Sequence, residues 1–169
     1  GLRWARGPFE LANRIGVSEA LRMASAYAAE SELNLPDWFT IRKESFEFSY
    51  IDVGVEDGIA TVRINRPEAM NALNVTLVSQ LGEALDGLNS RDDVTTIVLE
   101  GAGKAFVAGA DVKFFVDKIR ADAIQEIYDF TAHGHAVLDK LENSQKTTIA
   151  LTTGLALGGG LELALACDY

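Results

Sequence analysis

The stretch TTGLALGGGLELALACDY, residues 152–169, places three consecutive glycines directly before an apolar segment whose only charge ahead of Asp168 is Glu162. Glycine has no Cβ atom, so its backbone can approach a ligand closely. A second loop rich in glycine and alanine, GAGKAFVAGAD, spans residues 101–111. Small residues also allow a loop to pack tightly on its sheet. Because two such loops occur, we favour a site in which backbone N–H groups converge on one oxygen.

The flanking sequence predicts an α/β fold. FEFSYIDVGV (46–55) and IATVRI (59–64) are typical of two strands joined by the turn EDG. Leucines at helical spacing follow, and the remaining segments predict a strand at 93–101, a helix at 123–142 and a strand at 147–154. An opening hairpin followed by alternating helices and strands indicates parallel pairing. Both glycine-rich loops then follow the carboxyl ends of strands, where ligands bind in such folds.

Glu162 has two interpretations. As a carboxylate in the first turn of a helix it would complement the helix dipole, which contributes about 0.3–1 kcal/mol. Its neighbours in the segment LELALA are otherwise apolar, so the helix has no other polar face. We therefore expect Glu162 to be buried, and a buried carboxylate suits general acid–base chemistry.

Composition excludes several classes of protein. The chain has 169 residues, of which 48% are hydrophobic and 24% charged, as in a globular domain. Its net charge of −10 argues against nucleic acid or a membrane surface as a partner, since both are polyanions. The one cysteine, Cys167, cannot form an internal disulfide. We expect a cytoplasmic protein in which Cys167 packs as a small apolar residue.

The first part of the chain predicts a helical appendage. Residues 1–35 are typical of two helices, the first starting at Gly7-Pro8, and residues 34–45 of a linker broken by Pro36. Trp4 and Trp38 are expected to anchor the packing of these helices. The predicted boundaries are residues 1–40 for the appendage with its linker and residues 45–169 for the α/β domain.

Other chemistry is poorly supported. Neither of the common glycine-rich phosphate motifs is present. His133 and His135 are two positions apart in a predicted helix, where side chains point about 200° from each other. They cannot chelate one metal ion there, so we expect no metal site.

Three segments carry a resemblance. INRPEAMNAL (64–73), GKAFVAGADVKFF (103–115) and GLALGGGLELALACDY (154–169) resemble three successive motifs of the enoyl-CoA hydratase/isomerase (crotonase) family. The resemblance covers residues 50–169 and implies a crotonase-like ββα spiral, here incomplete. A shorter segment, RWARGPFELANRIGVSEAL (3–21), resembles the C-terminal helical region of 3-hydroxyacyl-CoA dehydrogenases. Residues 1–40 would then be the tail of such a domain in a fused fatty-acid-oxidation enzyme, without NAD binding.

The resemblance also implies a site. The substrate is an acyl-CoA thioester, whose carbonyl oxygen is held by the backbone N–H groups of Ala110 and Gly159. Glu162 activates the water that adds to C3 of a 2-trans-enoyl-CoA. Arg66, Lys104 and Lys113 are candidates for contacts with the CoA phosphates. The residues implied in acyl-CoA binding are Ala69, Met70, Ala108, Gly109, Asp111, Val112, Lys113 and Gly158.

The family pattern continues beyond Tyr169, where its second catalytic glutamate lies. We therefore expect little activity from these 169 residues alone, and a homotrimer or hexamer for the complete protein. No cofactor is implied beyond the coenzyme A of the substrate. Thr147 and Thr153 depart from the family pattern and leave the reaction open. The alternatives are an enoyl-CoA isomerase, another acyl-CoA reaction, and a non-catalytic fragment that binds CoA or only assembles.

Overall fold

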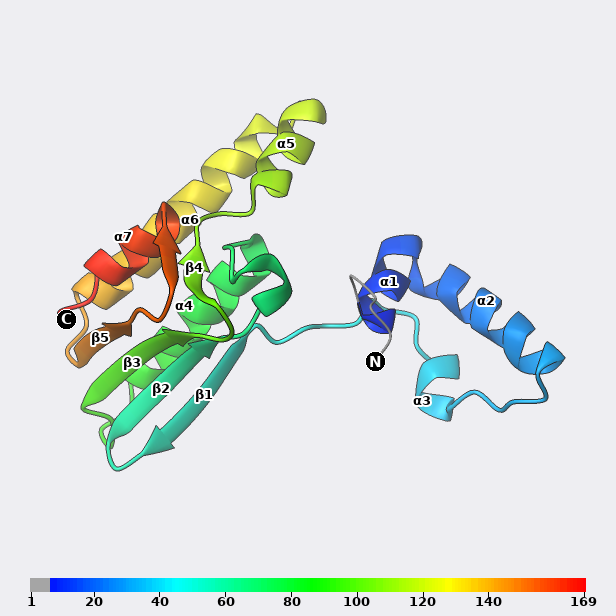
Figure 1. Ribbon diagram of the computed structural model, residues 1–169, viewed down its shortest axis with the longest axis horizontal. Coiled ribbons are helices and arrows are strands. Elements are labelled where there is room, and N and C mark those ends of the chain that lie inside the picture. Colours follow the sequence, from blue (N-terminus) through cyan, green and yellow to red (C-terminus); the bar gives the residue numbers. More distant parts are fainter. Residues whose placement is uncertain (1–6) are drawn as a thin grey trace. The chain divides into compact units, whose positions relative to one another are not determined.

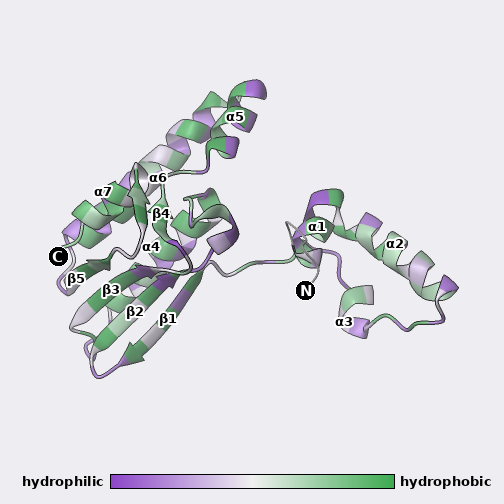
Figure 2. Ribbon diagram, in the orientation of Figure 1, coloured by the Kyte–Doolittle hydropathy of each residue, from purple (hydrophilic) through white to green (hydrophobic). Residues whose placement is uncertain are grey.

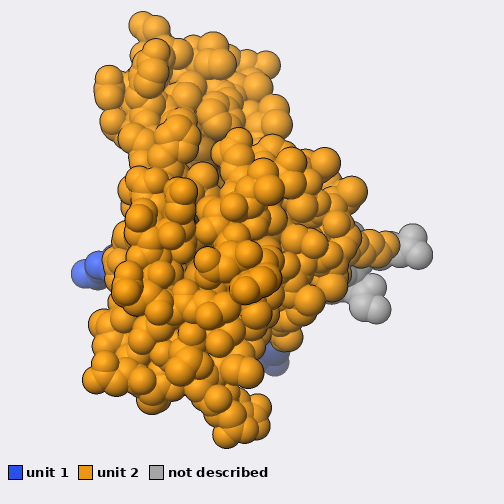
Figure 3. All heavy atoms as spheres, turned by 90° about the vertical axis from the view of Figure 1, so that its left-hand side faces the viewer, with its two compact units in different colours: residues 1–48 blue, residues 49–169 orange. Residues whose placement is uncertain are grey.

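The computed structural model describes residues 7–169 and divides into two compact units, residues 1–48 and 49–169 (Figures 1 and 3). Trp4, expected to anchor packing, lies outside the described residues. No described helix combines the length and the apolar character that a membrane span requires.

The first unit is helical. It contains α1 (Pro8–Ile15), α2 (Val17–Glu30) and a short α3 (Asp37–Thr40). Pro8 opens α1, as predicted, because proline at the first helical position loses no intrahelical hydrogen bond. Gly16, with a φ of 92°, separates α1 from α2. The helix α3 lies within the segment predicted as a linker.

Aromatic side chains hold the first unit together. Trp38 contacts Phe9 at 5.7 Å between ring centroids, and Phe9 contacts Phe46 at 4.5 Å. The backbone N–H and C=O of Phe46 both bond to the side chain of Asn13, at 2.6 and 2.7 Å. Phe46 thus belongs to the helical unit. The strand predicted from residue 46 begins only at Ile51, because Asn13 has taken the hydrogen-bonding groups that a strand would use.

The second unit is built on a four-stranded sheet in the order β1-β2-β3-β5. Its strands are β1 (Ile51–Glu56), β2 (Ile59–Ile64), β3 (Thr96–Gly101) and β5 (Thr147–Leu151). The first two are antiparallel and the others pair in parallel, which confirms the predicted hairpin and parallel layer. Asp57 and Gly58 form the hairpin turn with φ angles of 49° and 81°, as a type I′ turn requires.

Helices and apolar side chains complete the core. The helices are α4 (Val75–Asn89), α5 (Val112–Arg120), α6 (Ile124–Glu142) and α7 (Gly159–Leu165), with a 3₁₀ turn, η1 (Pro67–Ala69). The helix α4 packs against β1, β2 and α6. Figure 2 shows that hydrophobic residues predominate in the strands and in α7. The core between sheet and helices includes Val62, Ile64, Leu77, Leu81, Leu85, Ile97, Leu99, Phe106, Val137 and Leu141.

A second sheet was not predicted. β4 (Ala105–Ala108) and β6 (Leu155–Leu157) pair in parallel within the two segments interpreted as loops. The apolar residues of β4 explain this, because Ala105, Phe106 and Val107 are all buried. The pairing aligns Ala108 with Leu157, so the residues that follow both strands emerge side by side.

Candidate active site

Two tight turns follow the paired strands β4 and β6. Gly109 and Gly158 adopt φ angles of 80° and 48°, which glycine reaches without strain. The turns are adjacent, since a Cβ atom on Gly158 would lie 3.8 Å from the Cα atom of Gly109. The residues that come next are Ala110 and Gly159, the two predicted oxyanion donors.

Ala110 is held from both sides. The N–H of Leu73 donates to the carbonyl of Gly109, and the N–H of Asp111 donates to the carbonyl of Leu73, both at 2.8 Å. These bonds fix the backbone around Ala110 without using its own N–H. Within residues 7–169 neither the N–H of Ala110 nor that of Gly159 donates a hydrogen bond, so both remain available to a ligand.

Gly160 fixes the start of α7. A Cβ atom there would overlap the carbonyl oxygen of Val107 in β4, so only glycine permits this approach. The close contact sets the distance between the first turn of α7 and the second sheet. It therefore holds the first turn of α7, which contains Gly159, against the strand that leads to Ala110.

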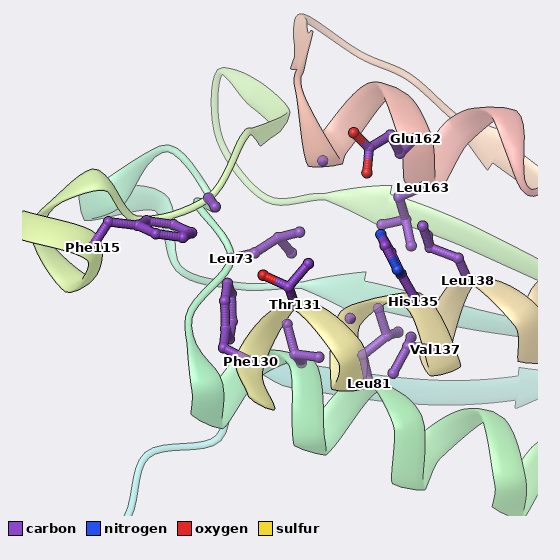
Figure 4. Close-up of a pocket in the computed structure, with 14 residues that line it drawn as sticks. Leu73, Leu81, Phe115, Phe130, Thr131, His135, Val137, Leu138, Glu162 and Leu163 are labelled. Carbon is purple, nitrogen blue, oxygen red and sulfur yellow. The ribbon is translucent and has the colours of Figure 1, made fainter. Parts of the chain in front are cut away.

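A cavity of about 200 Å³ unites the predicted catalytic residues. Ala110, Gly159 and Glu162 all line it, the first from the turn after β4 and the others from α7 (Figure 4). Apolar side chains form most of the remaining wall. These are Leu73, Val78, Leu81, Phe115, Phe130, Val137, Leu138 and Leu163, with Thr131, Gly134 and His135 completing the lining.

Glu162 is exposed, so the prediction that it is buried is wrong. The helix α7 packs on β4, β5 and β6 and buries only Gly160 and Leu163. Its other apolar residues are uncovered: the exposed fraction is 49% for Leu161 and 74% for Leu165. An apolar sequence therefore did not mean an enclosed helix. What the structure gives Glu162 instead is a position at the wall of the cavity (Figure 4).

The predicted acyl-CoA contacts lie on segments that lead into the cavity without lining it. Ala69 ends η1 and Met70 follows it, with its carbonyl accepting the N–H of Ala108 at 3.1 Å. Gly109 and Gly158 form the turns described above. Asp111, Val112 and Lys113 open α5, where Asp111 accepts the N–H of Lys113 at 3.1 Å as the helix cap.

The candidate phosphate-binding residues separate into two groups. Arg66 turns inward, donating to the carbonyl of Ala72 at 2.8 Å and to the carboxylate of Asp111 at 2.9 Å. Arg66 therefore links two loops through these bonds, and its guanidinium is already paired with a protein carboxylate. Lys113 is exposed and forms an ion pair with Asp117 on the next turn of α5, and Lys104 is exposed.

Asn71 organises the site, although the sequence analysis did not single it out. It is fully buried, with a φ of 59°. Its side-chain amide donates to the carbonyls of Ala105 at 2.8 Å and Phe106 at 3.1 Å, and its side-chain oxygen accepts the N–H of Arg66 at 2.9 Å. One side chain thus ties the loop after β2 to the backbone of β4. The sequence did offer one indication of this role. Asn71 lies between Pro67 and the start of α4, and asparagine tolerates the positive φ that a tight turn there requires.

The two histidines take different positions on α6. The Nε2 atom of His133 lies 3.3 Å from the hydroxyl of Ser79, whereas His135 lines the cavity. From the sequence, a surface or packing role was expected for both histidines in preference to metal binding, and the place of His135 in the cavity wall was not predicted. The spacing of Thr131, His135 and Leu138 could have indicated that His135 lies on the same helix face as an apolar residue, because residues four and three apart share a face.

Cys167 follows α7 and is half-buried. Its thiol lies 3.5 Å from the carbonyl oxygen of Leu163. Desolvation by burial raises the pKa of the thiol to about 11, so little thiolate forms at neutral pH. This supports the interpretation of Cys167 as a packing residue.

Comparison with known proteins agrees with this geometry. The sequence profile of the family described as enoyl-CoA hydratase/isomerase matches residues 54–169. A probable enoyl-CoA hydratase of Mycobacterium bovis is 41% identical over 65% of this chain and 40% of its own length. A 4-chlorobenzoyl coenzyme A dehalogenase of Arthrobacter is 42% identical over 70% of this chain and 43% of its own length.

The fold agrees as well. A crystal structure described as an enoyl-CoA hydratase/carnithine racemase from Magnetospirillum magneticum is 37% identical, with a TM-score of 0.66. The similarity covers 72% of this chain and 45% of that chain. The chain thus spans less than half the length of these relatives. The matched region begins after the helical unit, whose likeness to a dehydrogenase tail stays a prediction. Residues 54–169 have the α/β crotonase fold, and the chain belongs to the enoyl-CoA hydratase/isomerase family.

Proposed function

We propose that this chain provides the thioester-binding site of an enoyl-CoA hydratase. The observation that supports it is that Ala110 and Gly159, whose N–H groups donate no hydrogen bond to a described residue, line the same cavity as Glu162. A thioester oxygen gains negative charge as an enolate forms. Fixed donors that point at this oxygen therefore stabilise the transition state more than the substrate.

The proposed reaction is the addition of water across a 2-trans double bond. The carboxylate of Glu162 accepts a proton from water as the water oxygen forms a bond to C3. The electron pair of the double bond moves toward the thioester and places charge on its oxygen, between Ala110 and Gly159. As the enolate collapses, its electron pair forms the C2–H bond with a proton donated by the second catalytic glutamate of the family pattern, which completes 3-hydroxyacyl-CoA. Glu162 holds the proton taken from water, and proton exchange with solvent restores both carboxyl groups. Glu162 follows Gly159 by three residues, about one turn of α7, so the base and one oxyanion donor share one helix.

Coenzyme A is part of the substrate in this proposal, and no further cofactor is assigned. Its nearest contacts are proposed to be Ala69, Met70, Ala108, Gly109, Asp111, Val112, Lys113 and Gly158. We extend the proposal to a fused dehydrogenase and hydratase of fatty-acid β-oxidation, located in the cytoplasm. Support for the fusion comes from the residues before Ser49, which form a compact unit distinct from the one that contains the family domain.

A homotrimer or hexamer is also proposed for the complete protein. Leu155, Leu157 and Leu165 on β6 and α7 are 47%, 53% and 74% exposed, which is unusual for large apolar side chains. Tyr169 adds to this surface with 79% exposure. Sedimentation of the complete protein tests the oligomer separately from the reaction.

Two other functions use the same site. An enoyl-CoA isomerase would also form an enolate at the oxyanion donors, without adding water at Glu162. The second alternative is a different acyl-CoA reaction, which the similarity to a 4-chlorobenzoyl coenzyme A dehalogenase supports. Incubation with a 3-enoyl-CoA separates an isomerase from a hydratase, since only the isomerase moves the double bond.

The test is the conversion of crotonyl-CoA to 3-hydroxybutyryl-CoA by the full-length protein and by its Glu162→Gln variant. We expect the substitution to lower kcat by at least about 100-fold, as for loss of a general base, while butyryl-CoA still binds. Glu83→Gln, at an exposed position of α4, is the matched control. Normal turnover by Glu162→Gln would refute the assigned role. Binding of butyryl-CoA without any turnover by the wild type would favour a non-catalytic CoA-binding fragment.

A further inference from the structure

The cavity contains a polar side chain that the proposed reaction does not use. Its polar lining side chains are Thr131, His135 and Glu162. The hydroxyl of Thr131 already donates to the carbonyl of Ile127 at 2.9 Å within α6. No described residue forms a hydrogen bond with the imidazole of His135. The His135 side chain is solvent-exposed at the cavity wall, so a ligand in the cavity can reach it.

The position of His135 relates it to Glu162. The two side chains come from different helices, α6 and α7, that bound the same cavity. Figure 4 shows His135 extending from α6 toward the side of the cavity formed by Leu163 and Glu162. Gly134, the neighbour of His135 on α6, also lines the cavity, and a Cβ atom there would meet nothing within 4 Å.

The reacting atoms of a bound acyl group would lie between these two side chains. A thioester oxygen held at Ala110 and Gly159 leaves C3 two carbons further along the acyl chain, within a cavity otherwise lined by apolar groups. The only oxygen at C3 is the attacking water before addition and the hydroxyl group after it. Such an oxygen loses part of its hydration as the acyl group enters a mainly apolar cavity, so a hydrogen-bonding partner there stabilises it.

We propose that His135 hydrogen-bonds the oxygen at C3 of the acyl group, from the wall opposite Glu162. This inference rests on the proposed function. It makes His135 a specificity-determining contact that favours a 3-hydroxyacyl-CoA over a saturated acyl-CoA of equal length. It also gives the attacking water a second partner besides Glu162, which fixes its direction of approach to C3.

The test compares two ligands of equal chain length, 3-hydroxybutyryl-CoA and butyryl-CoA, which differ in the oxygen at C3. Dissociation constants are measured by calorimetry for the wild type and for His135→Leu, an apolar replacement. The wild type should prefer 3-hydroxybutyryl-CoA, and His135→Leu should reduce that preference by about 3- to 10-fold, as for loss of one hydrogen bond. Binding of butyryl-CoA, which lacks the oxygen, should change little.

Two variants sharpen the result. His133→Leu makes the same change two positions away, outside the cavity lining, and should keep the wild-type preference. His135→Gln retains a side-chain N–H donor and should keep most of the preference. An unchanged preference in His135→Leu, or an equal fall in His133→Leu, would overturn the role of His135 and leave the thioester site standing. If neither ligand binds to the wild type, the proposed function fails and this inference fails with it.

Discussion

The guanidinium of Arg66 and the carboxylate of Asp111 form an ion pair at 2.9 Å, although they are 45 positions apart in the sequence. Arg66 comes from the segment after β2, and Asp111 caps α5 directly after the oxyanion donor Ala110. The exposed fraction of the two side chains is 15% and 24%, so water screens the pair only partly. This link and the Leu73 backbone bonds hold the Ala110 segment in place.

Asp111→Ala should therefore lower the free energy of unfolding by about 2–3 kcal/mol. It removes the cap of α5 and the hydrogen-bonded carboxylate of the partly buried Arg66, which leaves only the longer ion pair with Glu68 at 3.9 Å. Denaturation with urea measures the change. The matched control is Asp117→Ala on the same helix, which removes an exposed ion pair with Lys113 and should have a smaller effect. Equal effects from the two substitutions would contradict the structural role of Asp111.

Asn71→Ala should destabilise the domain by about 2–4 kcal/mol. Carbonyl groups of β4 would lose their buried donor, and alanine would have to adopt a positive φ. Asn74→Ala offers a comparison, because Asn74 only caps α4 by accepting the N–H of Leu77. Its loss should cost about 1 kcal/mol. An Asn71→Ala variant no less stable than Asn74→Ala would show that the buried network is unimportant.

Gly160→Ala should prevent normal packing of α7 on β4. The added Cβ atom meets the backbone carbonyl of Val107, which cannot rotate away as a flexible side chain would. Gly87→Ala provides the contrast, since a Cβ atom there meets nothing within 4 Å and the residue lies inside α4. That substitution should stabilise the helix by about 0.5–1 kcal/mol. Melting temperatures of both variants test the pair, and a stable Gly160→Ala would refute the close approach.

The thiol of Cys167 should react slowly with an aromatic disulfide reagent. Desolvation raises its pKa from the ordinary 9.0 to about 11, and the thiolate fraction falls tenfold for each pKa unit. Below pH 9 the folded chain should thus react about a hundredfold more slowly than the unfolded chain. Its rate should keep rising with pH up to about 11. Since the chain has one cysteine, the absorbance reports on Cys167 alone. Equal rates for folded and unfolded chains would show that the thiol is not desolvated.

The sheet of the second unit was predictable because its strands carry local signals. Asp57-Gly58 specifies the hairpin, and the β-branched residues of Thr96–Gly101 mark a buried strand. β4 and β6 were missed because they are short and pair only with each other. Their small and apolar residues have the composition of a tight loop. The partner that makes Ala105–Ala108 a strand lies about 50 positions later, outside any local pattern.

The candidate site was predictable from motifs to the extent that Ala110, Gly159 and Glu162 do line one cavity. The exposure of Glu162 was not predictable, because the apolar sequence of α7 does not show how many other helices and strands pack around that helix. The role of Asn71 depends on carbonyl groups more than 30 positions away. The place of His135 depends on α6 and α7 lining the same cavity. The helix face that carries His135 could be identified from the sequence, but the cavity wall formed by α7 could not.

The most direct measurement of the central claim is the infrared carbonyl band of ¹³C-labelled butyryl-CoA bound to the protein. Donation from Ala110 and Gly159 should lower its frequency relative to the free thioester. Gly159→Pro removes one donor while proline remains compatible with the first position of a helix. Gly159→Ala adds a Cβ atom at the same place, 3.1 Å from the Leu73 side chain, but keeps the N–H. The account predicts that the proline variant loses much more of the frequency shift than the alanine variant. An equal shift in the two variants, or none in the wild type, would contradict it.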